Sequence, residues 1–289
     1  MAFCAHWSYS KDRNYAPCVR KQEGVETNMA KNFCDLTGKK AVVVGGAGGI
    51  GQAIAQGLAE AGAQVMISSR KQEALDRAVQ EVQTACGEVM LTCTGDASKE
   101  ADVVHLLESA VQAMGTVDIL VNSQGFNKKF PGTEFPVDMW DAMFDANVKS
   151  VMLTCKHFGK YMKEHDIHGK IINLSSVRGI RAVGNGGNGN VGYCATKGAV
   201  EMLTKAFASD LRPNIQVNAI GPTITYTPMM VGILPADPTE RNAKAASMPA
   251  MRIGMPEDCA GPAVFLASSA SDFITGSTLY PDGGLTAIG

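Results

Sequence analysis

Short runs rich in β-branched residues alternate with longer stretches of helical periodicity from about residue 35 onward. The predicted strands are Lys40–Gly45, Gln64–Ser69, Glu88–Thr94, Val117–Asn122, Lys170–Ser175, Ile215–Ile220 and Ser277–Tyr280. A strand–helix repeat at this spacing is typical of right-handed βαβ units, which build one parallel sheet with helices on both faces. We therefore predict an α/β fold, formed by a single doubly wound domain with a seven-stranded parallel sheet.

Two segments fall outside this alternation. Residues 1–34 are polar and aperiodic, which predicts a flexible N-terminal extension before one domain that covers residues 35–289. The segment Thr223–Ala246 contains prolines and is of mixed polarity, so we expect it to form an excursion outside the sheet.

Composition narrows the class of protein. With 45% hydrophobic and 19% charged residues the chain can bury a sizeable core, and its net charge of −2 argues against a nucleic-acid partner. No apolar run approaches the roughly 20 residues that cross a bilayer, and the N-terminal residues lack the apolar core of a secretory signal. The eight cysteines form no C-x-x-C pair, so we expect reduced thiols and no metal site. These features predict a cytoplasmic protein that has no membrane contact.

The first predicted strand ends in a glycine-rich turn that runs directly into the helical pattern Gln52–Gly62. Glycines at a strand-to-helix turn permit a tight reversal, and they let backbone N–H groups and the helix N-terminus approach a pyrophosphate. Because the turn follows a strand and opens a helix, it predicts the dinucleotide site of a Rossmann fold. The predicted contacts are Gly45, Gly48, Gly49, Ile50 and Gly51.

Three motifs follow one another in the order typical of one enzyme family. They are Gly45-x-x-x-Gly49-x-Gly51, then Asn122-Ser123-Gln124-Gly125 after the fourth strand, then Tyr193-x-x-x-Lys197 in a helical pattern. In these motifs the chain resembles the short-chain dehydrogenase/reductase family, from residue 35 to the C-terminus. The resemblance implies an oxidoreductase that forms homotetramers and binds NADP or NAD. It also implies cofactor contacts by Asp96, Asn122, Gly125, Tyr193, Lys197, Pro222, Thr225 and Thr227.

The end of the second strand bears on the choice between NADP and NAD. An acidic residue there would hold the ribose hydroxyls of NAD and repel an added phosphate. The chain instead has Ser69 and Arg70, whose hydroxyl and guanidinium can bind a 2′-phosphate. We therefore predict NADP(H), with NAD as the alternative. Gly48 argues against this choice, since NADP-using members of the family often have a basic residue at that position.

Tyr193 and Lys197 are four residues apart, so on a helix they share one face. A tyrosine has an ordinary pKa near 10, and a nearby ammonium and a nicotinamide cation could lower it by about 1–3 units. Tyr193 would then exchange a proton with the substrate oxygen while the cofactor exchanges a hydride. The resemblance implies that Ser176 polarises the substrate oxygen and that Asn147 orients a water on the lysine.

Basic residues surround the predicted mouth of the site, and they favour an anionic small-molecule substrate. The segment Asn127–Pro136 resembles the equivalent part of gluconate 5-dehydrogenases and related sugar-acid oxidoreductases, and Gly184–Asn190 adds an asparagine-rich loop. We therefore predict oxidation of a secondary alcohol, or reduction of the ketone, on a polyhydroxylated carboxylate. The predicted substrate contacts are Lys128, Arg178 and Asn185.

Two other functions remain open at this stage. A reductase of 3-oxoacyl carriers, ketosteroids or other carbonyl compounds would share every catalytic residue, because fold does not determine substrate. A nucleotide-sensing protein without chemistry would be expected to lose the Tyr193 and Lys197 pair, which this chain keeps.

Overall fold

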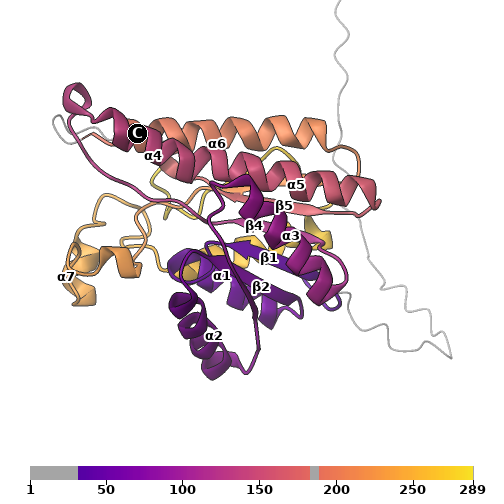
Figure 1. Cartoon of the computed structure of the whole chain (residues 1–289). Coiled ribbons are helices and arrows are strands. Elements are labelled where there is room, and N and C mark those ends of the chain that lie inside the picture. Colours follow the sequence, from indigo (N-terminus) through magenta and orange to yellow (C-terminus); the bar gives the residue numbers. More distant parts are fainter. Residues whose placement is uncertain (1–31, 183–188, 289) are drawn as a thin grey trace, which may run out of the picture. The chain divides into compact units, whose positions relative to one another are not determined.

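All seven strands pair in parallel in one sheet of the computed structural model, which describes residues 32–182 and 189–288 (Figure 1). Across the sheet the order is β3-β2-β1-β4-β5-β6-β7, so successive strands are added on one side of β1 and then on the other. Such a reversal opens a crevice outside the carboxyl ends of the strands, where ligands bind in folds of this kind. The predicted doubly wound α/β fold is confirmed.

The strand β2 has the predicted bounds, and the other strands are shorter than the sequence predicted by one to three residues. They are β1 Lys40–Val44, β2 Gln64–Ser69, β3 Leu91–Thr94, β4 Ile119–Asn122, β5 Lys170–Leu174, β6 Gln216–Ile220 and β7 Thr278–Leu279. The largest difference is at β3, whose pairing with β2 begins at Leu91, so Glu88–Met90 lie before the ladder. At the other edge, β7 pairs with β6 through only two residues.

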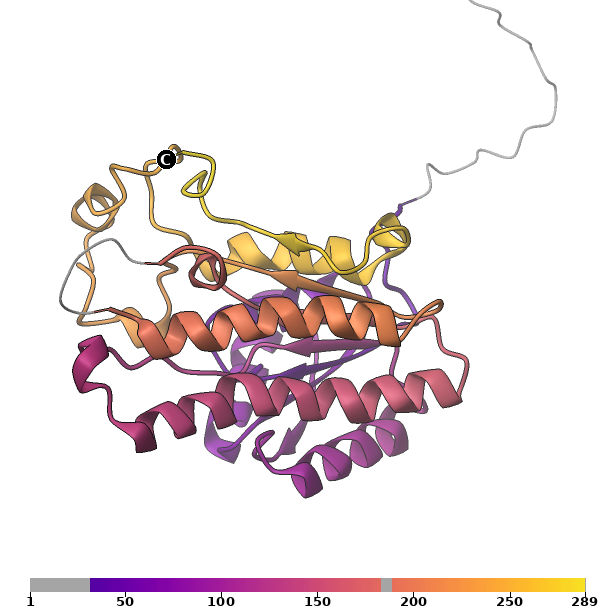
Figure 2. The same cartoon turned by 90° about the horizontal axis from the view of Figure 1, so that it is seen from above.

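Helices cover both faces of the sheet (Figure 2). They are α1 Gly49–Glu60, α2 Gln72–Cys86, α3 Glu100–Met114, α4 Val137–Phe144, α5 Ser150–Glu164, α6 Val191–Asp210, α7 Pro238–Ala243 and α8 Ala260–Ala267. Apolar side chains of α1, α2 and α8 contribute to one large core cluster, those of α3, α5 and α6 contribute to a second, and Ala245, Met248 and Ile253 form a small third cluster. None of the described helices combines the length and the apolar content that a membrane span requires.

The strand β1 shows how the sheet joins the two clusters. Ala41 and Val43 point into the cluster of α1, α2 and α8, whereas Val42 and Val44 point into the cluster of α3, α5 and α6. Side chains alternate between the faces of a strand, and here both faces are buried, so β1 reads as a continuous apolar run. After Lys40 at its start, the strand β1 therefore carries no polar side chain.

Candidate active site

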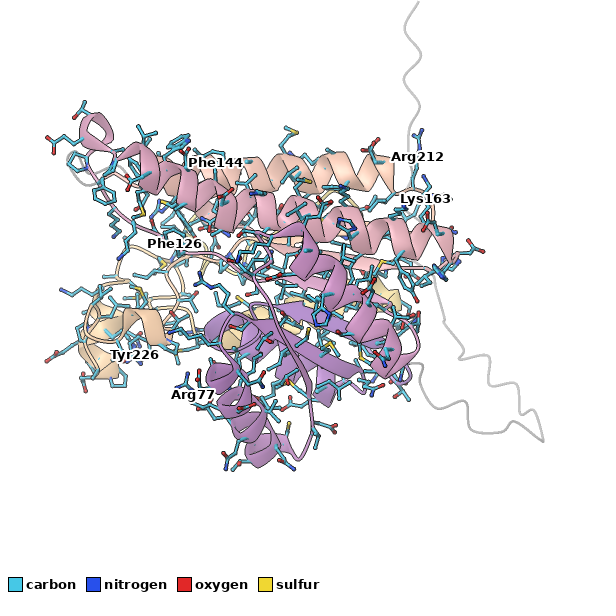
Figure 3. All side chains as sticks on the ribbon, in the orientation of Figure 1. Arg77, Phe126, Phe144, Lys163, Arg212 and Tyr226 are labelled. Atoms are coloured by element: carbon cyan, nitrogen blue, oxygen red, sulfur yellow. The ribbon has the colours of Figure 1, made fainter. Side chains whose placement is uncertain are left out.

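A cavity of about 680 Å³ lies at the carboxyl edge of the sheet, between the loops that follow β1 to β6. This volume is in the range of small-molecule and cofactor sites. Figure 3 labels Arg77, Phe126 and Tyr226 on this side of the molecule, and it labels Lys163 and Arg212 at the opposite end of the long helices. The cavity is thus at the topological switch point that the strand order predicts.

The glycine turn forms one wall of the cavity. Gly45 has a φ of +77°, and a Cβ on Gly51 would lie 2.2 Å from the carbonyl oxygen of Gly45, so neither position accepts a side chain without a shift. A Cβ on Gly48 would meet no atom within 4 Å and would point into open space. The helix α1 starts at Gly49, three residues earlier than predicted, so its unpaired N–H groups face the turn. The wall therefore fits a pyrophosphate.

The far end of the cavity is lined by Ser69, Arg70 and Asp96, as predicted, and also by Arg77 and Ser98. Asp96 Oδ1 accepts hydrogen bonds from the backbone and hydroxyl of Ser98 at 3.0 and 2.8 Å. Burial alone would raise the pKa of Asp96, but these hydrogen bonds and the Arg70 charge lower it overall. Asp96 is thus an anion held by its neighbours, and the two guanidiniums remain available for a ligand.

Tyr193, Lys197 and Ser176 meet near the middle of the cavity. The Lys197 Nζ lies 5.7 Å from the centre of the Tyr193 ring and donates to the carbonyl oxygen of Leu174 at 2.6 Å. The Ser176 hydroxyl donates to the carbonyl oxygen of Pro222 at 3.3 Å and accepts from the backbone N–H of Arg178 at 3.2 Å, and it acts to lower the pKa of the Tyr193 hydroxyl. The end of β5 and the first turns of α6 therefore present two hydroxyl groups and one ammonium to the same space.

The protonation of this group differs from the sequence expectation. Burial raises the pKa of Tyr193 to about 12, although the hydrogen bond with Ser176 and the Arg178 charge both act to lower it. Burial likewise lowers the pKa of Lys197 to about 8, and the Glu201 carboxylate opposes that shift. Without a bound nicotinamide cation, desolvation outweighs the attraction that would lower the pKa of the phenol.

Asn147 does not line the cavity. It lies fully buried in the π-helical turn Asp145–Lys149, which joins α4 to α5. Its amide accepts from the N–H of Phe126 and donates to the carbonyl of Phe126, both at 2.9 Å, and it donates to Thr196 Oγ1 at 3.1 Å. The side chain therefore fixes the loop after β4 against α6. Gly125 permits this contact, since a Cβ there would lie 2.7 Å from Asn147 Oδ1.

Known proteins resemble the chain over most of its length. A family model described as enoyl-(acyl carrier protein) reductase matches residues 45–286. Glucose 1-dehydrogenase of Gluconobacter oxydans is 36% identical over 255 residues, which are 88% of this chain and 94% of that protein. The 3beta-hydroxysteroid dehydrogenase 2 of Eggerthella lenta is 38% identical over 257 residues, which are 87% of this chain and 96% of that protein. The chain belongs to the short-chain dehydrogenase/reductase family.

A solved structure of the family shows the same fold. It is the crystal structure of a gluconate 5-dehydrogenase from Burkholderia cenocepacia in complex with NADP and tartrate. The two chains superpose with a TM-score of 0.80 at 34% identity, and the match covers 89% of this chain and 98% of that one. This short-chain dehydrogenase/reductase is therefore an oxidoreductase, and it resembles sugar-acid enzymes as the sequence suggested.

Two further predicted site residues of this dehydrogenase, besides Asn147, lie outside the cavity. Asn122 is fully buried, and its amide donates to Asn173 Oδ1 at 2.9 Å and accepts from Thr154 Oγ1 at 2.7 Å. As the last residue of β4, Asn122 points into the core, and the chain reaches the cavity only from Ser123 onward. Lys128 is exposed and does not line the cavity, whereas its neighbour Lys129 does. A substrate contact of Lys128 therefore stays a prediction.

The remaining predicted substrate and cofactor contacts lie on either side of Tyr193, Lys197 and Ser176. Arg178 lines the cavity beside Tyr193, and Asn185 falls outside the described residues. Pro222, Thr225 and Thr227 also line the cavity, and a Cβ on Gly49 would make van der Waals contact with Thr227 at 3.4 Å.

Several residues that line the cavity were not predicted as contacts. They include Arg77, Gln124 and Asn127, and the cavity is also lined by Lys129, Asn190 and Met230, which lie in segments that the sequence predicts at the mouth of the site. Asn127 Nδ2 lies 3.4 Å from Asn190 Oδ1, which links the loop after β4 to the start of α6. Arg77 could have been found from its spacing, because it lies two helical turns after Arg70. Within residues 32–182 and 189–288, no group of His, Cys, Asp or Glu side chains is placed to hold a metal ion.

Proposed function

We propose that this short-chain dehydrogenase/reductase interconverts a secondary alcohol and a ketone on a sugar acid, and that it uses NADP(H). The observation that carries the proposal is the meeting of three features in one cavity. The glycine turn is at one end, Tyr193 and Ser176 are in the middle, and the cationic residues Arg178 and Lys129 are on the remaining wall. We also propose that the enzyme acts as a homotetramer in the cytoplasm, which the family resemblance implies.

The residues at the far end of the cavity support NADP. The glycine turn would hold the pyrophosphate, and Ser69, Arg70 and Arg77 would hold the 2′-phosphate through charge-assisted hydrogen bonds. When bound, the dinucleotide supplies a hydride acceptor or donor at its nicotinamide. A carboxylate is present at this end, but Asp96 is paired with Ser98 and follows β3 rather than β2.

Proton transfer would be carried by Tyr193. Its hydroxyl and that of Ser176 line the same cavity, so a substrate oxygen placed between them would receive two hydrogen bonds. In ketone reduction Tyr193 gives its proton to that oxygen, and in alcohol oxidation it takes the proton back. Lys197, held by Leu174, would bind the nicotinamide ribose and stabilise the phenolate.

The substrate carboxylate would bind to Arg178 and Lys129. Arg178 is held by carbonyl oxygens, since its Nη1 donates to Ala182 at 3.2 Å, so the guanidinium is fixed at the cavity wall. The amides of Asn127 and Asn190 lie beside it and are suited to substrate hydroxyls. The Burkholderia relative is in complex with tartrate, which is a hydroxylated carboxylate, and this supports the choice of substrate class.

A second candidate function has its own observation. Ile224, Pro228 and Met230 also line the cavity and give one wall apolar character. The Eggerthella relative is a hydroxysteroid dehydrogenase, so a bulky apolar ketone is the alternative substrate class. A steroid has no carboxylate for Arg178 and Lys129, which makes these two residues the point at which the candidates differ.

The test is turnover by the purified full-length chain. Reduced-cofactor absorbance should change with D-gluconate and NADP, and with keto-gluconates and NADPH, at a kcat/KM well above that for ketosteroids or acetoacetyl thioesters. Lys129→Ala and Arg178→Ala should each raise the KM for the sugar acid about tenfold or more, as expected for loss of a charge-assisted hydrogen bond. Lys128→Ala is the matched control and should leave KM unchanged. Faster turnover of a steroid, insensitive to both variants, would favour the second candidate.

A further inference from the structure

The helix α6 carries a third ionisable residue beyond the catalytic pair. Tyr193, Lys197 and Glu201 are spaced by four residues, so they lie along one side of the helix. Glu201 is only 8% exposed, although a carboxylate is rarely buried without a partner. Glu201 follows the two cavity residues along α6 and lies next to the edge strand β7.

The carboxylate of Glu201 is fixed but incompletely paired. Glu201 Oε2 accepts a hydrogen bond from Thr278 Oγ1 at 2.5 Å, and Oε1 is buried without a hydrogen-bond partner. Tyr280 lies beside it, and burial together with the Glu201 charge raises the pKa of Tyr280 to about 12. Tyr280 therefore stays neutral.

Lys197, like Glu201, is a buried charged residue that is incompletely paired. Its ammonium is 5% exposed and bonds to the carbonyl oxygen of Leu174, and no described carboxylate is close enough to form an ion pair with it. Burial lowers the pKa of this ammonium, and the one charge that opposes the shift is that of Glu201, one helical turn away. The two buried charges compensate each other through low-dielectric protein rather than through direct contact.

The other charges near α6 act elsewhere. Arg178, which follows β5, acts on Tyr193 and Cys194. Lys170 at the start of β5 pairs with Asp272 at the opposite edge of the sheet. The buried thiol of Cys155 on α5 has its pKa raised to about 12 by desolvation and is neutral. The remaining charged groups on α4, α5 and the turn between them are exposed or pair with surface residues: Asp138, Asp141, Asp145, Lys149, Lys156, His157, Lys160, Lys163 and Glu164.

We infer that Glu201 is a positioning residue that keeps Lys197 protonated, and that Thr278 holds the carboxylate where it does so. The inference rests on the proposed role of Lys197 in binding the cofactor and assisting Tyr193. Removal of the Glu201 charge leaves the burial of Lys197 unopposed, so Lys197 becomes neutral at a lower pH. A neutral Lys197 binds the ribose hydroxyls more weakly and no longer stabilises the Tyr193 phenolate.

The experiment measures NADPH binding to the full-length chain as a function of pH, by fluorescence titration without substrate. In the wild-type chain the dissociation constant should increase as Lys197 loses its proton. Glu201→Gln should move the midpoint of that increase to lower pH by about one unit or more, which is the size typical of a buried charge neighbour. Glu201→Asp keeps the charge, so its midpoint should lie close to the wild-type midpoint. Thr278→Val should lower the midpoint by less than Glu201→Gln does.

The outcomes separate this inference from the proposed function. If the wild-type chain does not bind NADPH, the proposed function fails. If it binds but Glu201→Gln has the wild-type midpoint, the role of Glu201 is overturned while the proposed function stands. Circular-dichroism melting curves show whether each variant is folded. Should Glu201→Gln fail to fold, Thr278→Val carries the test: a midpoint at lower pH than in wild type supports the inference, and an unchanged midpoint overturns it.

Discussion

Tyr193 combines a pKa raised by burial with a place beside Ser176 in the cavity, so it rests as a neutral acid at the proposed site of reaction. Tyr193→Phe removes only the hydroxyl and keeps the ring that packs near Lys197. We expect kcat to fall by about 10²–10⁴-fold, the usual range for loss of a general acid or base, with the NADPH dissociation constant changed less than about threefold. Tyr161→Phe on α5 is the matched control. Near-normal turnover by Tyr193→Phe would exclude its catalytic role.

Lys197 should also leave a signature in stability. Its pKa is about 8 in the folded chain against 10.5 for an ordinary lysine, so below pH 8 both folded and unfolded states hold the proton and the cost of burial is fully present. Between about pH 8 and 10.5 the unfolded state binds more protons, so the free energy of unfolding rises with pH. Relative to Lys197→Met, the wild-type chain should gain about 1–3 kcal/mol over that interval. Urea unfolding at both ends of it measures the difference, and parallel curves for the two proteins would contradict the prediction.

Single residues also mark the limit of prediction from sequence. The motif identified the segment Asn122–Gly125, but only the register of β4 decides that Asn122 points into the core and Ser123 toward the cavity. The same holds for Lys128 and Lys129, since neighbouring side chains in an extended segment point in different directions. Asn147 was identified by resemblance, yet its buried hydrogen bonds with Phe126 depend on the π-helical turn, for which the sequence has no signal.

At the scale of elements, the glycine turn before α1 contains one glycine that folding requires and another that cofactor binding requires. Gly51→Ala forces a clash with the backbone of Gly45 and should lower both the melting temperature and NADPH affinity. Gly48→Val places its side chain in open space within the cavity, so it should weaken NADPH binding tenfold or more while the melting temperature changes little. Thermal melting and fluorescence titration of both variants check this. A large loss of melting temperature in Gly48→Val would contradict the distinction.

The helix α2 should contribute to the choice of cofactor through Arg77. Because Arg77 lines the far end of the cavity, Arg77→Ala should weaken NADPH binding by about 10–100-fold and leave NADH binding unchanged, as expected for loss of one charge-assisted hydrogen bond to a phosphate. Lys71→Ala at the start of the same helix removes an equal charge outside the cavity and is the control. Equal loss of NADH binding in Arg77→Ala would remove the argument for NADP.

The elements themselves were largely predictable because periodicity and burial agree along β1 to β6. Val42 and Val43 enter different clusters, yet both are apolar, which is the pattern of a strand covered on two faces. Strand ends were less predictable, as at Glu88–Met90, because pairing depends on the partner strand. The prediction of a flexible extension at residues 1–34 concerns mainly residues 1–31, which lie outside the described part of the chain.

At the scale of the whole molecule, the family resemblance predicts association. Light scattering should give a mass of roughly four times 30.5 kDa for a homotetramer, and the value should not fall on dilution to working concentrations. Because β7 is the last strand of the sheet and Glu201 lies against it through Thr278, the same measurement should accompany the Glu201 variants. A mass near that of one chain would contradict the tetramer.

The division between buried core and cavity loops has a consequence for divergence among related genes. None of Lys129, Arg178 or Asn127 belongs to either core cluster, so mutations that alter which metabolite is accepted leave the packing beneath the sheet intact. Substitutions at these positions are therefore under little selection to preserve folding. A duplicated copy of such a gene can explore new metabolites quickly while it inherits an unchanged hydride-transfer centre.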